Sequence, residues 1–232
     1  AQGGTSTGTR NAAYTFIEKF LGVRWLMPGP HGDYVPKMTS VTIPDQDLQG
    51  APFFLNRRVP YTQENRPEVK QWWARQRLGW SLSLYHSHNW TAIKPEAFTQ
   101  HPDWFAESGG VRVPPAGRYK LCTTNPGLIQ AFADAAIAYF DANPQATCFS
   151  LSPADSGGWC ECANCKALYE TDPNGELSVT PAIIHFYNGV AQIVAKKYPQ
   201  KLLAGYVYAA YVYPPSKPFK LAPNMFLVWA PS

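Results

Sequence analysis

The sequence predicts an α/β fold, a partial (β/α) barrel of the TIM type with about five parallel strands, preceded by the remnant of a small α/β domain. Apolar segments of strand length alternate with amphipathic helical segments, which is typical of a parallel sheet. No Gly-rich phosphate loop follows the first of these strands, which favours a barrel over the alternative, an open doubly wound sheet. A closed barrel needs eight strands and about 250 residues. The 232 residues therefore predict an incomplete barrel.

Residues 1–45 are expected to hold one helix and one extended segment. Tyr14, Ile17 and Leu21 share a stripe along segment 11–20, which indicates an amphipathic helix. A loop rich in Pro and Gly then leads to an extended segment at 34–43. One helix and one strand are too small to fold alone. We therefore assign 1–45 to the remnant domain and 46–232 to the barrel domain.

The barrel domain is expected to alternate strands and helices. Pro67 and the pair Asn125-Pro126 are start signals for two of the helices. The expected strands span 53–59, 80–86, 146–152, 202–208 and 225–229, and the expected helices span 65–78, 125–140 and 181–198. Strands at 53–59 and 225–229 would leave exposed sheet edges, so we expect the chain to form a homodimer that covers them.

The amino-acid composition indicates which classes of binding partner to expect. Hydrophobic residues make up 45% of the chain, which is enough for a core and excludes general disorder. Aromatic residues reach 14% and charged residues only 16%, a balance that favours sugar binding, although aromatic residues also fill ordinary cores. The net charge of +4 is spread without a Lys/Arg run, so no nucleic-acid partner is expected. No apolar stretch is long enough to cross a bilayer, so no membrane partner is expected.

The most specific motif is a cysteine cluster. Cys160, Cys162 and Cys165 lie within six residues, and three thiolates at this spacing can bind one zinc ion. A fourth ligand would come from Cys122, His101 or a water molecule. A strained local disulfide and three reduced thiols are the alternatives. We expect zinc, in a structural or a catalytic role.

Polar side chains follow the second and third expected strands. Asp155 follows the third strand, and barrel active sites lie at the carboxyl ends of strands, so we expect Asp155 to be catalytic. Its alternative role is to cap the turn before Gly157-Gly158. His86 and His88 share one face of the second strand, and we expect His88 to be catalytic and His86 to bind substrate. A structural role for at least one of the two histidines is the alternative.

Five aromatic side chains near these strand ends are expected to bind substrate. They are Trp90, Tyr206, Tyr208, Tyr211 and Trp229. Tyr206 and Tyr208 lie on one face of a strand, where they could line a sugar cleft, but core packing explains Tyr206 equally well. The sequence contains no G-x-S-x-G, Walker or H-E-x-x-H motif, which argues against serine-hydrolase, nucleotide-binding and zincin classes.

As a set, these motifs resemble a large bacterial glycoside-hydrolase-like family of largely unknown function. Its barrel is related to endo-β-N-acetylglucosaminidases and, more distantly, to α-glucuronidases and β-hexosaminidases. The resemblance covers residues 8 to about 215 and depends on Gly8-Thr9-Arg10, Phe20–Trp25, Pro28-Gly29-Pro30, His88, His101–Ala106, Leu121–Pro126, Asp155 and Cys160–Cys165.

The resemblance implies a carbohydrate-active hydrolase from a bacterial, exported parent protein, here truncated at both ends. An Asn-Asp pair is expected in this family where the chain has Ala154-Asp155, which puts native glycosidase activity in doubt. Glycosidases use two carboxyl groups, and Glu107 and Glu161 are candidate partners of Asp155. The expected function is glycoside hydrolysis or glycan binding. The alternatives are a zinc-dependent hydrolase of an ester or phosphoester and a non-catalytic sugar-binding module.

Overall fold

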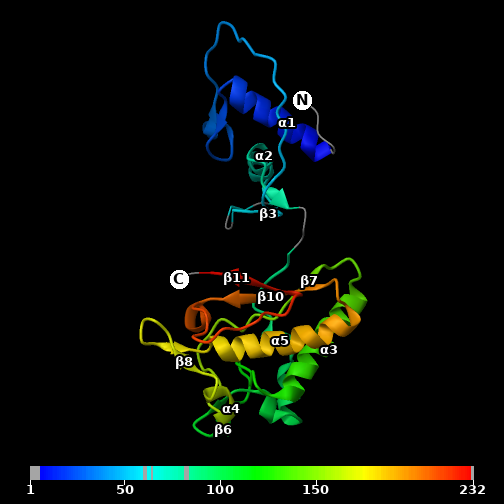
Figure 1. Cartoon of the computed structure of the whole chain (residues 1–232), viewed down its shortest axis with the longest axis vertical. Coiled ribbons are helices and arrows are strands. Elements are labelled where there is room, and N and C mark those ends of the chain that lie inside the picture. The colour runs from blue at the N-terminus through cyan, green and yellow to red at the C-terminus, as the bar shows by residue number, and fades with distance from the viewer. Residues whose placement is uncertain (1–5, 60–61, 64, 81–83, 231–232) are drawn as a thin grey trace. The chain divides into compact units, whose positions relative to one another are not determined.

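The computed structural model describes residues 6–59, 62–63, 65–80 and 84–230 (Figure 1). The chain divides into two compact units, Ala1–Ser83 and Leu84–Ser232. The division falls well after the expected boundary at 45/46, because the helix expected at 65–78 packs with the N-terminal segments. Among the described residues, no helix combines the length and the apolar character that crossing a membrane requires.

The N-terminal unit contains two helices and two small antiparallel pairs of strands. Its elements are α1 (Ser6–Phe20), β1 (Arg24–Trp25), β2 (Asp33–Tyr34), β3 (Asn56–Arg57), α2 (Pro67–Arg75) and β4 (Gly79–Trp80), with β1 paired to β2 and β3 paired to β4. Trp25 is buried, and its carbonyl accepts a hydrogen bond of 2.8 Å from the indole N–H of Trp72. These contacts join α2 to the segments before it.

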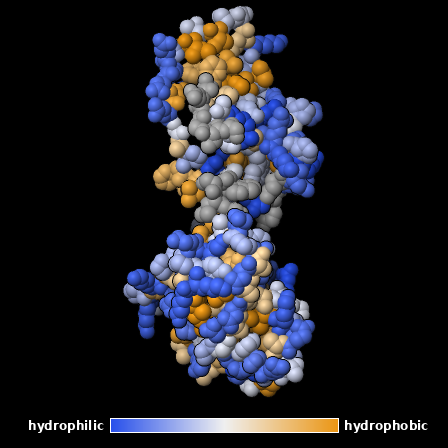
Figure 2. All heavy atoms as spheres, turned by 90° about the vertical axis from the view of Figure 1, so that its right-hand side faces the viewer, coloured by the Kyte–Doolittle hydropathy of each residue, from blue (hydrophilic) through white to orange (hydrophobic). Residues whose placement is uncertain are grey.

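The prediction of a buried, parallel strand over 53–59 is wrong. Only Asn56–Arg57 forms a strand, and it pairs antiparallel with β4. Phe53 is 91% exposed, and Figure 2 shows hydrophobic side chains on the surface of this unit. An apolar run indicates that a segment can be buried, but it does not supply a partner to cover it. The extended segment expected at 34–43 is likewise reduced to β2.

The C-terminal unit is built on a parallel sheet of three strands, in the order β11-β10-β7. They are β7 (Cys148–Ser150), β10 (Leu202–Val207) and β11 (Met225–Trp229), and all three lie where the sequence predicts strands. Helices α3 (Pro126–Ala142) and α5 (Thr180–Lys197) pack against each other on one side of the sheet (Figure 1). The Asn125 side chain caps α3 by accepting a hydrogen bond of 3.0 Å from the N–H of Leu128.

Short elements surround this sheet. They are the 3₁₀ turns Trp90–Ala92, Pro95–Thr99, Pro102–Trp104 and Ala209–Tyr211, the strands β5 (Glu107–Ser108), β6 (Val111–Arg112), β8 (Glu170–Thr171) and β9 (Leu177–Ser178), and the helix α4 (Ala163–Lys166). β5 pairs with β6, and β8 pairs with β9, both antiparallel. A further 3₁₀ turn, Pro30–Gly32, belongs to the N-terminal unit.

A mixed α/β fold with a parallel sheet is thus confirmed, with three strands in that sheet where five were expected. The second expected strand falls partly on residues 81–83, which lie outside the described residues. Trp80 belongs to the antiparallel strand β4, whereas His88 forms a single parallel bridge with Ser152, beside β7. The segment that contains His88 therefore lies beside the sheet, but among the described residues its only β-bridge is the one to Ser152.

The core of the C-terminal unit lies between the sheet and the two long helices. Tyr187 of α5 is fully buried and lies directly against Gly205 of β10. A Cβ atom at position 205 would lie 2.3 Å from the Tyr187 ring, so only glycine allows helix and strand to approach this closely. This packing fixes β10 and, with it, the residues that follow the strand.

Candidate functional site

A pocket of about 250 Å³ opens where the strands β7 and β10 end. The two strands run parallel and in register from Leu202, opposite Cys148, to Ala204, opposite Ser150, so the residues that follow them come together. The lining residues are Lys120, Ala154, Asp155, Ser156, Gly157, Trp159, Tyr208, Ala209, Ala210 and Tyr211. The expected meeting of the strand ends is therefore present, and it brings Asp155 and Tyr208 together.

Asp155 is held by two donors at the rim of the pocket. The Tyr208 hydroxyl donates a hydrogen bond to its carboxylate, and Nη1 of Arg118 lies 3.3 Å from the carboxylate. The Tyr208 hydrogen bond is the main cause that lowers the pKa of Asp155, with smaller effects from the charges of His88, Arg118 and Lys120. The same hydrogen bond raises the pKa of Tyr208 to about 12. At neutral pH this site therefore presents an ionised carboxylate and a neutral tyrosine.

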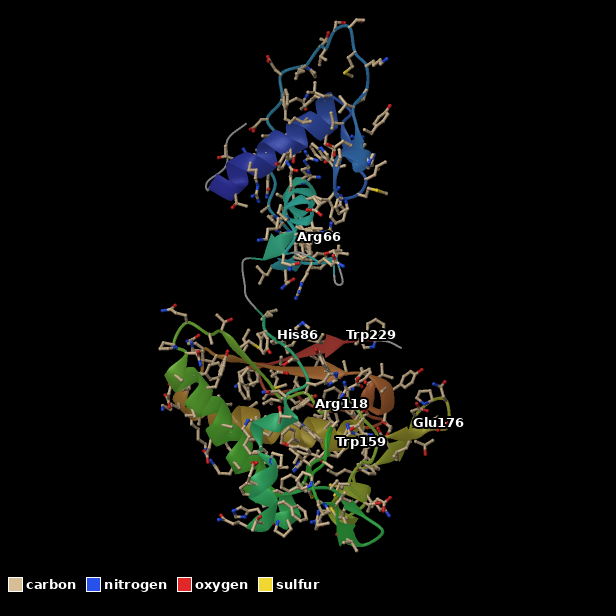
Figure 3. The ribbon with its side chains drawn as sticks, turned by 180° about the vertical axis from the view of Figure 1, so that it is seen from behind. Arg66, His86, Arg118, Trp159, Glu176 and Trp229 are labelled. Atoms are coloured by element: carbon tan, nitrogen blue, oxygen red, sulfur yellow. The ribbon has the colours of Figure 1, made fainter. Side chains whose placement is uncertain are left out.

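Lys120 places a buried ammonium group at the pocket. The residue is only 5% exposed, and its Nζ donates a hydrogen bond to the carbonyl of Ala154. Its Nζ also lies 4.0 Å from the ring centroid of Trp159, which is a cation–π contact. Burial lowers the pKa of Lys120 to about 8, against the opposing effect of the Asp155 charge. Arg118 and Trp159 are labelled in Figure 3.

Tyr211 contributes a second buried polar group. It is 2% exposed, and its ring makes an edge contact with Trp159 at 5.5 Å between centroids. Its hydroxyl is buried and has no hydrogen-bond partner among the described residues. Burial raises the pKa of this hydroxyl, so it stays protonated and can donate a hydrogen bond.

The two histidines lie beside the pocket rather than in its lining. The His88 ring lies 5.0 Å from the Tyr206 ring and 6.0 Å from the Tyr208 ring. Its Nδ1 is within hydrogen-bonding distance of the carbonyl of Pro153. His86 Nδ1 lies 3.2 Å from the Tyr206 hydroxyl. The structure therefore brings His88 close to Asp155 and Tyr208, whereas Tyr206 and His86 support one another.

Three aromatic residues expected to bind substrate do not line this pocket: Tyr206, Trp90 and Trp229. Trp90 is 1% exposed, and its indole N–H donates to the carbonyl of Leu151 at 3.0 Å. It is a core residue, because the 3₁₀ turn that begins at Trp90 directs its ring inward against Phe186. Trp229 is 68% exposed at the end of β11, where Figure 3 labels it. Trp90 and Trp229 thus lie outside the lining of this pocket, and their role in substrate binding stays a prediction.

A second candidate site, apart from the pocket, is a group of four cysteines that we call the thiol cluster: Cys122, Cys160, Cys162 and Cys165. All four are buried, and their sulfur atoms lie within 4.8 Å of one another. The Sγ of Cys122 lies 3.7 Å from that of Cys162 and 3.8 Å from that of Cys165. Tetrahedral zinc with Zn–S bonds of about 2.3 Å separates its sulfurs by about 3.8 Å. The four thiols can therefore hold a metal ion.

The fourth member of the cluster is Cys122, one of the three expected candidates. His101, another candidate, instead stacks on Trp104 with the ring centroids 4.0 Å apart. The cysteines are free, so the alternative of a local disulfide is not realised among the described residues. Cys122 precedes α3, whereas the other three flank and enter α4, so the cluster joins two distant segments of the chain.

Hydrogen-bond donors surround the sulfur atoms. The N–H of Glu107 and the guanidinium of Arg112 lie 3.4 and 3.7 Å from Cys160 Sγ. The Thr124 hydroxyl lies 3.2 Å from Cys165 Sγ. Donors of this kind orient and stabilise thiolate ligands. The hydrogen bonds around the cluster would therefore suit four thiolates that hold a metal ion.

Glu107 and Glu161 belong to the surroundings of the thiol cluster and not to the pocket. The Glu161 carboxylate accepts a hydrogen bond of 2.7 Å from the N–H of Gly109. The Glu107 carboxylate lies 3.6 Å from Arg112. Neither lines the pocket. Of its lining residues, Asp155 alone carries a carboxylate.

Sequence reasoning missed Lys120 and Trp159, which line the pocket, and Arg118, which pairs with Asp155 at its rim. Trp159 could have been found from the sequence, because it directly precedes Cys160 of the cysteine motif. Arg118 and Lys120 lie in a long irregular segment where neither helical nor strand periodicity applies. Only the tertiary structure places them beside Asp155.

Comparison with known proteins places the chain in a family. The family model described as "Domain of unknown function (DUF4838)" matches residues 27–230, which include most of the N-terminal unit and nearly all of the C-terminal unit. No curated protein and no solved structure matches the chain. The chain therefore belongs to the DUF4838 family.

Proposed function

We propose that the C-terminal unit is a carbohydrate-active, glycoside-hydrolase-like domain that binds a glycan in the pocket at Asp155. The observation that carries this proposal is the Asp155 carboxylate, held between Tyr208 and Arg118 at the carboxyl ends of parallel strands. Ligand sites of (β/α) barrels lie at this end of their strands. We accordingly propose that the parallel sheet is part of such a barrel.

The lining of the pocket suits a sugar. An ionised carboxylate accepts hydrogen bonds from sugar hydroxyl groups, and the rings of Trp159, Tyr208 and Tyr211 supply apolar walls. The volume of about 250 Å³ lies slightly below the roughly 300 Å³ at which small-molecule pockets commonly begin. A pocket of this size takes one sugar unit rather than a long stretch of polysaccharide.

Binding is the activity that these residues support best. Glycoside hydrolysis generally needs two carboxyl groups across the scissile bond, and Asp155 is the one carboxylate among the lining residues. Hydrolysis is the second candidate, favoured by the position of Asp155 after β7. In that reaction the lowered pKa of Asp155 suits a base or nucleophile and not a general acid, because the acid must be protonated.

We further propose that the thiol cluster binds zinc in a structural role. Four cysteines would occupy all four positions of a tetrahedral ion, whereas catalytic zinc keeps one position open for water or substrate. The alternative of a zinc-dependent hydrolase needs such an open position. Elemental analysis of the purified protein should find one zinc per chain. Turnover that requires zinc while the four thiols remain bound would contradict the structural role.

The test of glycan binding compares two aspartates with similar surroundings. Asp141 also accepts hydrogen bonds from a tyrosine, Tyr198, and from a cation, Lys197, but it does not line the pocket. We expect a glycan panel to contain a ligand whose affinity falls at least about tenfold in Asp155→Asn, the loss of a charged hydrogen-bond acceptor. Asp141→Asn should bind that ligand normally. Equal effects of both variants, or no glycan bound, would refute the proposal.

A further inference from the structure

Lys120 and Tyr211 present two buried polar groups at the same pocket, and neither has its hydrogen-bonding capacity filled. The ammonium of Lys120 has three donors, and its one described acceptor is the carbonyl of Ala154. The Tyr211 hydroxyl has no partner among the described residues. Buried donors without acceptors are costly and rare in folded proteins. An acceptor from outside the chain, either a water molecule or a ligand, can therefore complete them at this common position.

The charges of the pocket favour an anion as that acceptor. Arg118 and Asp155 form an ion pair with each other at its exposed rim, where the side chains are 70% and 44% exposed. Within the described part of the chain, no carboxylate forms an ion pair with Lys120. Asp155 also attracts the buried ammonium of Lys120, but it already forms the ion pair with Arg118. The two cations and one carboxylate at the pocket and its rim therefore sum to +1. Burial strengthens the attraction between such a charge and an oppositely charged ligand.

We propose that the pocket recognises an acidic sugar, with the sugar carboxylate bound by the ammonium of Lys120 and the hydroxyl of Tyr211. This inference rests on the proposed glycan binding and names the class of glycan. The carboxylate accepts one charged and one neutral hydrogen bond, while Asp155 accepts from the hydroxyl groups of the same sugar ring. The ion pair with Arg118 limits the repulsion between Asp155 and the ligand.

The competing explanation is that Lys120 only stabilises the fold. The face of Trp159, at 4.0 Å, and the carbonyl of Ala154 do compensate part of its charge. That explanation accounts for the lysine but leaves the Tyr211 hydroxyl without an acceptor. It also predicts that acidic and neutral sugars bind alike.

The test measures binding of two matched pairs of sugars at neutral pH by ligand-observed NMR titration. The pairs are D-glucuronate with D-glucose, and D-galacturonate with D-galactose, so each pair differs in one carboxylate. We expect the acidic member of at least one pair to bind about 10- to 100-fold more tightly, which is the range for a hydrogen bond to a charged group. Lys120→Met should lower that preference at least about fivefold, so that only the smaller share of the neutral Tyr211 hydrogen bond remains. Lys197→Met removes a lysine that does not line the pocket and should leave the preference unchanged.

Tyr211→Phe keeps the test valid if Lys120→Met does not fold. The substitution removes one oxygen atom that has no partner in the described residues, so it should not disturb the fold. It should weaken the acidic sugar about 2- to 10-fold, the range for one neutral hydrogen bond. The neutral sugar should be unaffected.

The outcomes separate this inference from the proposed function. Equal binding within both pairs, or no binding of either acid, overturns the acidic-sugar inference. A preference that is as large in both Lys120→Met and Tyr211→Phe as in the parent protein overturns it as well. Glycan binding itself is judged by the effect of Asp155→Asn on whichever glycans bind, including neutral ones, so it can stand when the inference about the acid fails.

Discussion

Tyr187→Phe and Tyr211→Phe should affect the free energy of unfolding differently. Tyr187 and Tyr211 are 0% and 2% exposed, so Tyr→Phe removes the same atom from two similarly buried places. The Tyr187 hydroxyl donates a hydrogen bond of 3.1 Å to the carbonyl of Tyr206 in β10. The Tyr211 hydroxyl has no partner within the described chain. The pair therefore compares a buried hydroxyl that is hydrogen-bonded with one that has no partner.

The magnitudes follow from these two environments. An intramolecular hydrogen bond contributes a net 0.5–1.5 kcal/mol, so Tyr187→Phe should lower the free energy of unfolding by about 1 kcal/mol. Burying a hydroxyl without a partner costs roughly 1–3 kcal/mol, so Tyr211→Phe should leave stability unchanged or raise it by about 1 kcal/mol. The two variants should then differ by about 1–2 kcal/mol.

Urea unfolding measures this difference directly if the free energy of unfolding depends on urea with the same slope in both variants. A shift of the midpoint at constant slope then reports a change in stability alone. The protein should be free of ligand, since a bound sugar would add its own stabilisation. Equal destabilisation by the two substitutions would refute the reasoning. It would mean that the Tyr211 hydroxyl already has a partner in the free protein, and the argument for an external acceptor at Lys120 would lose one of its two supports.

Three further predictions concern packing, the thiol cluster and the ionisation of Asp155. Gly205→Ala, whose Cβ would meet the Tyr187 ring at 2.3 Å, should lower the free energy of unfolding by at least about 2 kcal/mol. Gly50→Ala, which meets no atom within 4 Å, should change it little in the same unfolding experiment. Cys165→Ser should reduce the bound zinc measured by elemental analysis, and chelation of the parent protein should lower its Tm; unchanged zinc content would exclude Cys165 as a ligand. The NMR titration of Asp155 should have its midpoint below the ordinary value of about 3.9, and Tyr208→Phe should move it upward, because the Tyr208 hydrogen bond stabilises the ionised form. Since the folded-state pKa is lowered, the stability that this contact adds is fully present above the unfolded pKa and is lost as the pH falls through the folded one.

Local sequence signals predicted the helices and the central strands well. Asn125-Pro126 is both the predicted and the observed start of α3, and Met225–Trp229 has the predicted bounds. In these segments the periodicity, the capping residue and the burial all agree. The run at 53–59 shows the limit, because its apolar residues carry no information on which element would cover them.

The candidate site was predictable where its residues follow strands. Asp155 and Tyr208 were expected to meet because parallel strands place their carboxyl ends at one edge of the sheet, and they do meet. Cys122 was one of several candidates for the thiol cluster, since a ligand from a distant segment leaves no spacing motif. Lys120 was not predicted, because burial of a lysine depends on aromatic rings that only the folded chain assembles around it.

The position of the thiol cluster indicates which residues at the pocket can be substituted most safely. Trp159 directly precedes Cys160, and Lys120 lies two residues before Cys122, so both of these lining residues are next to the buried thiol cluster in the chain. The Arg118 side chain is 70% exposed at the rim. An engineer who wishes to retune the ligand preference can therefore begin at Arg118, where replacing an exposed side chain leaves no buried cavity, and keep Lys120 and Trp159 unchanged.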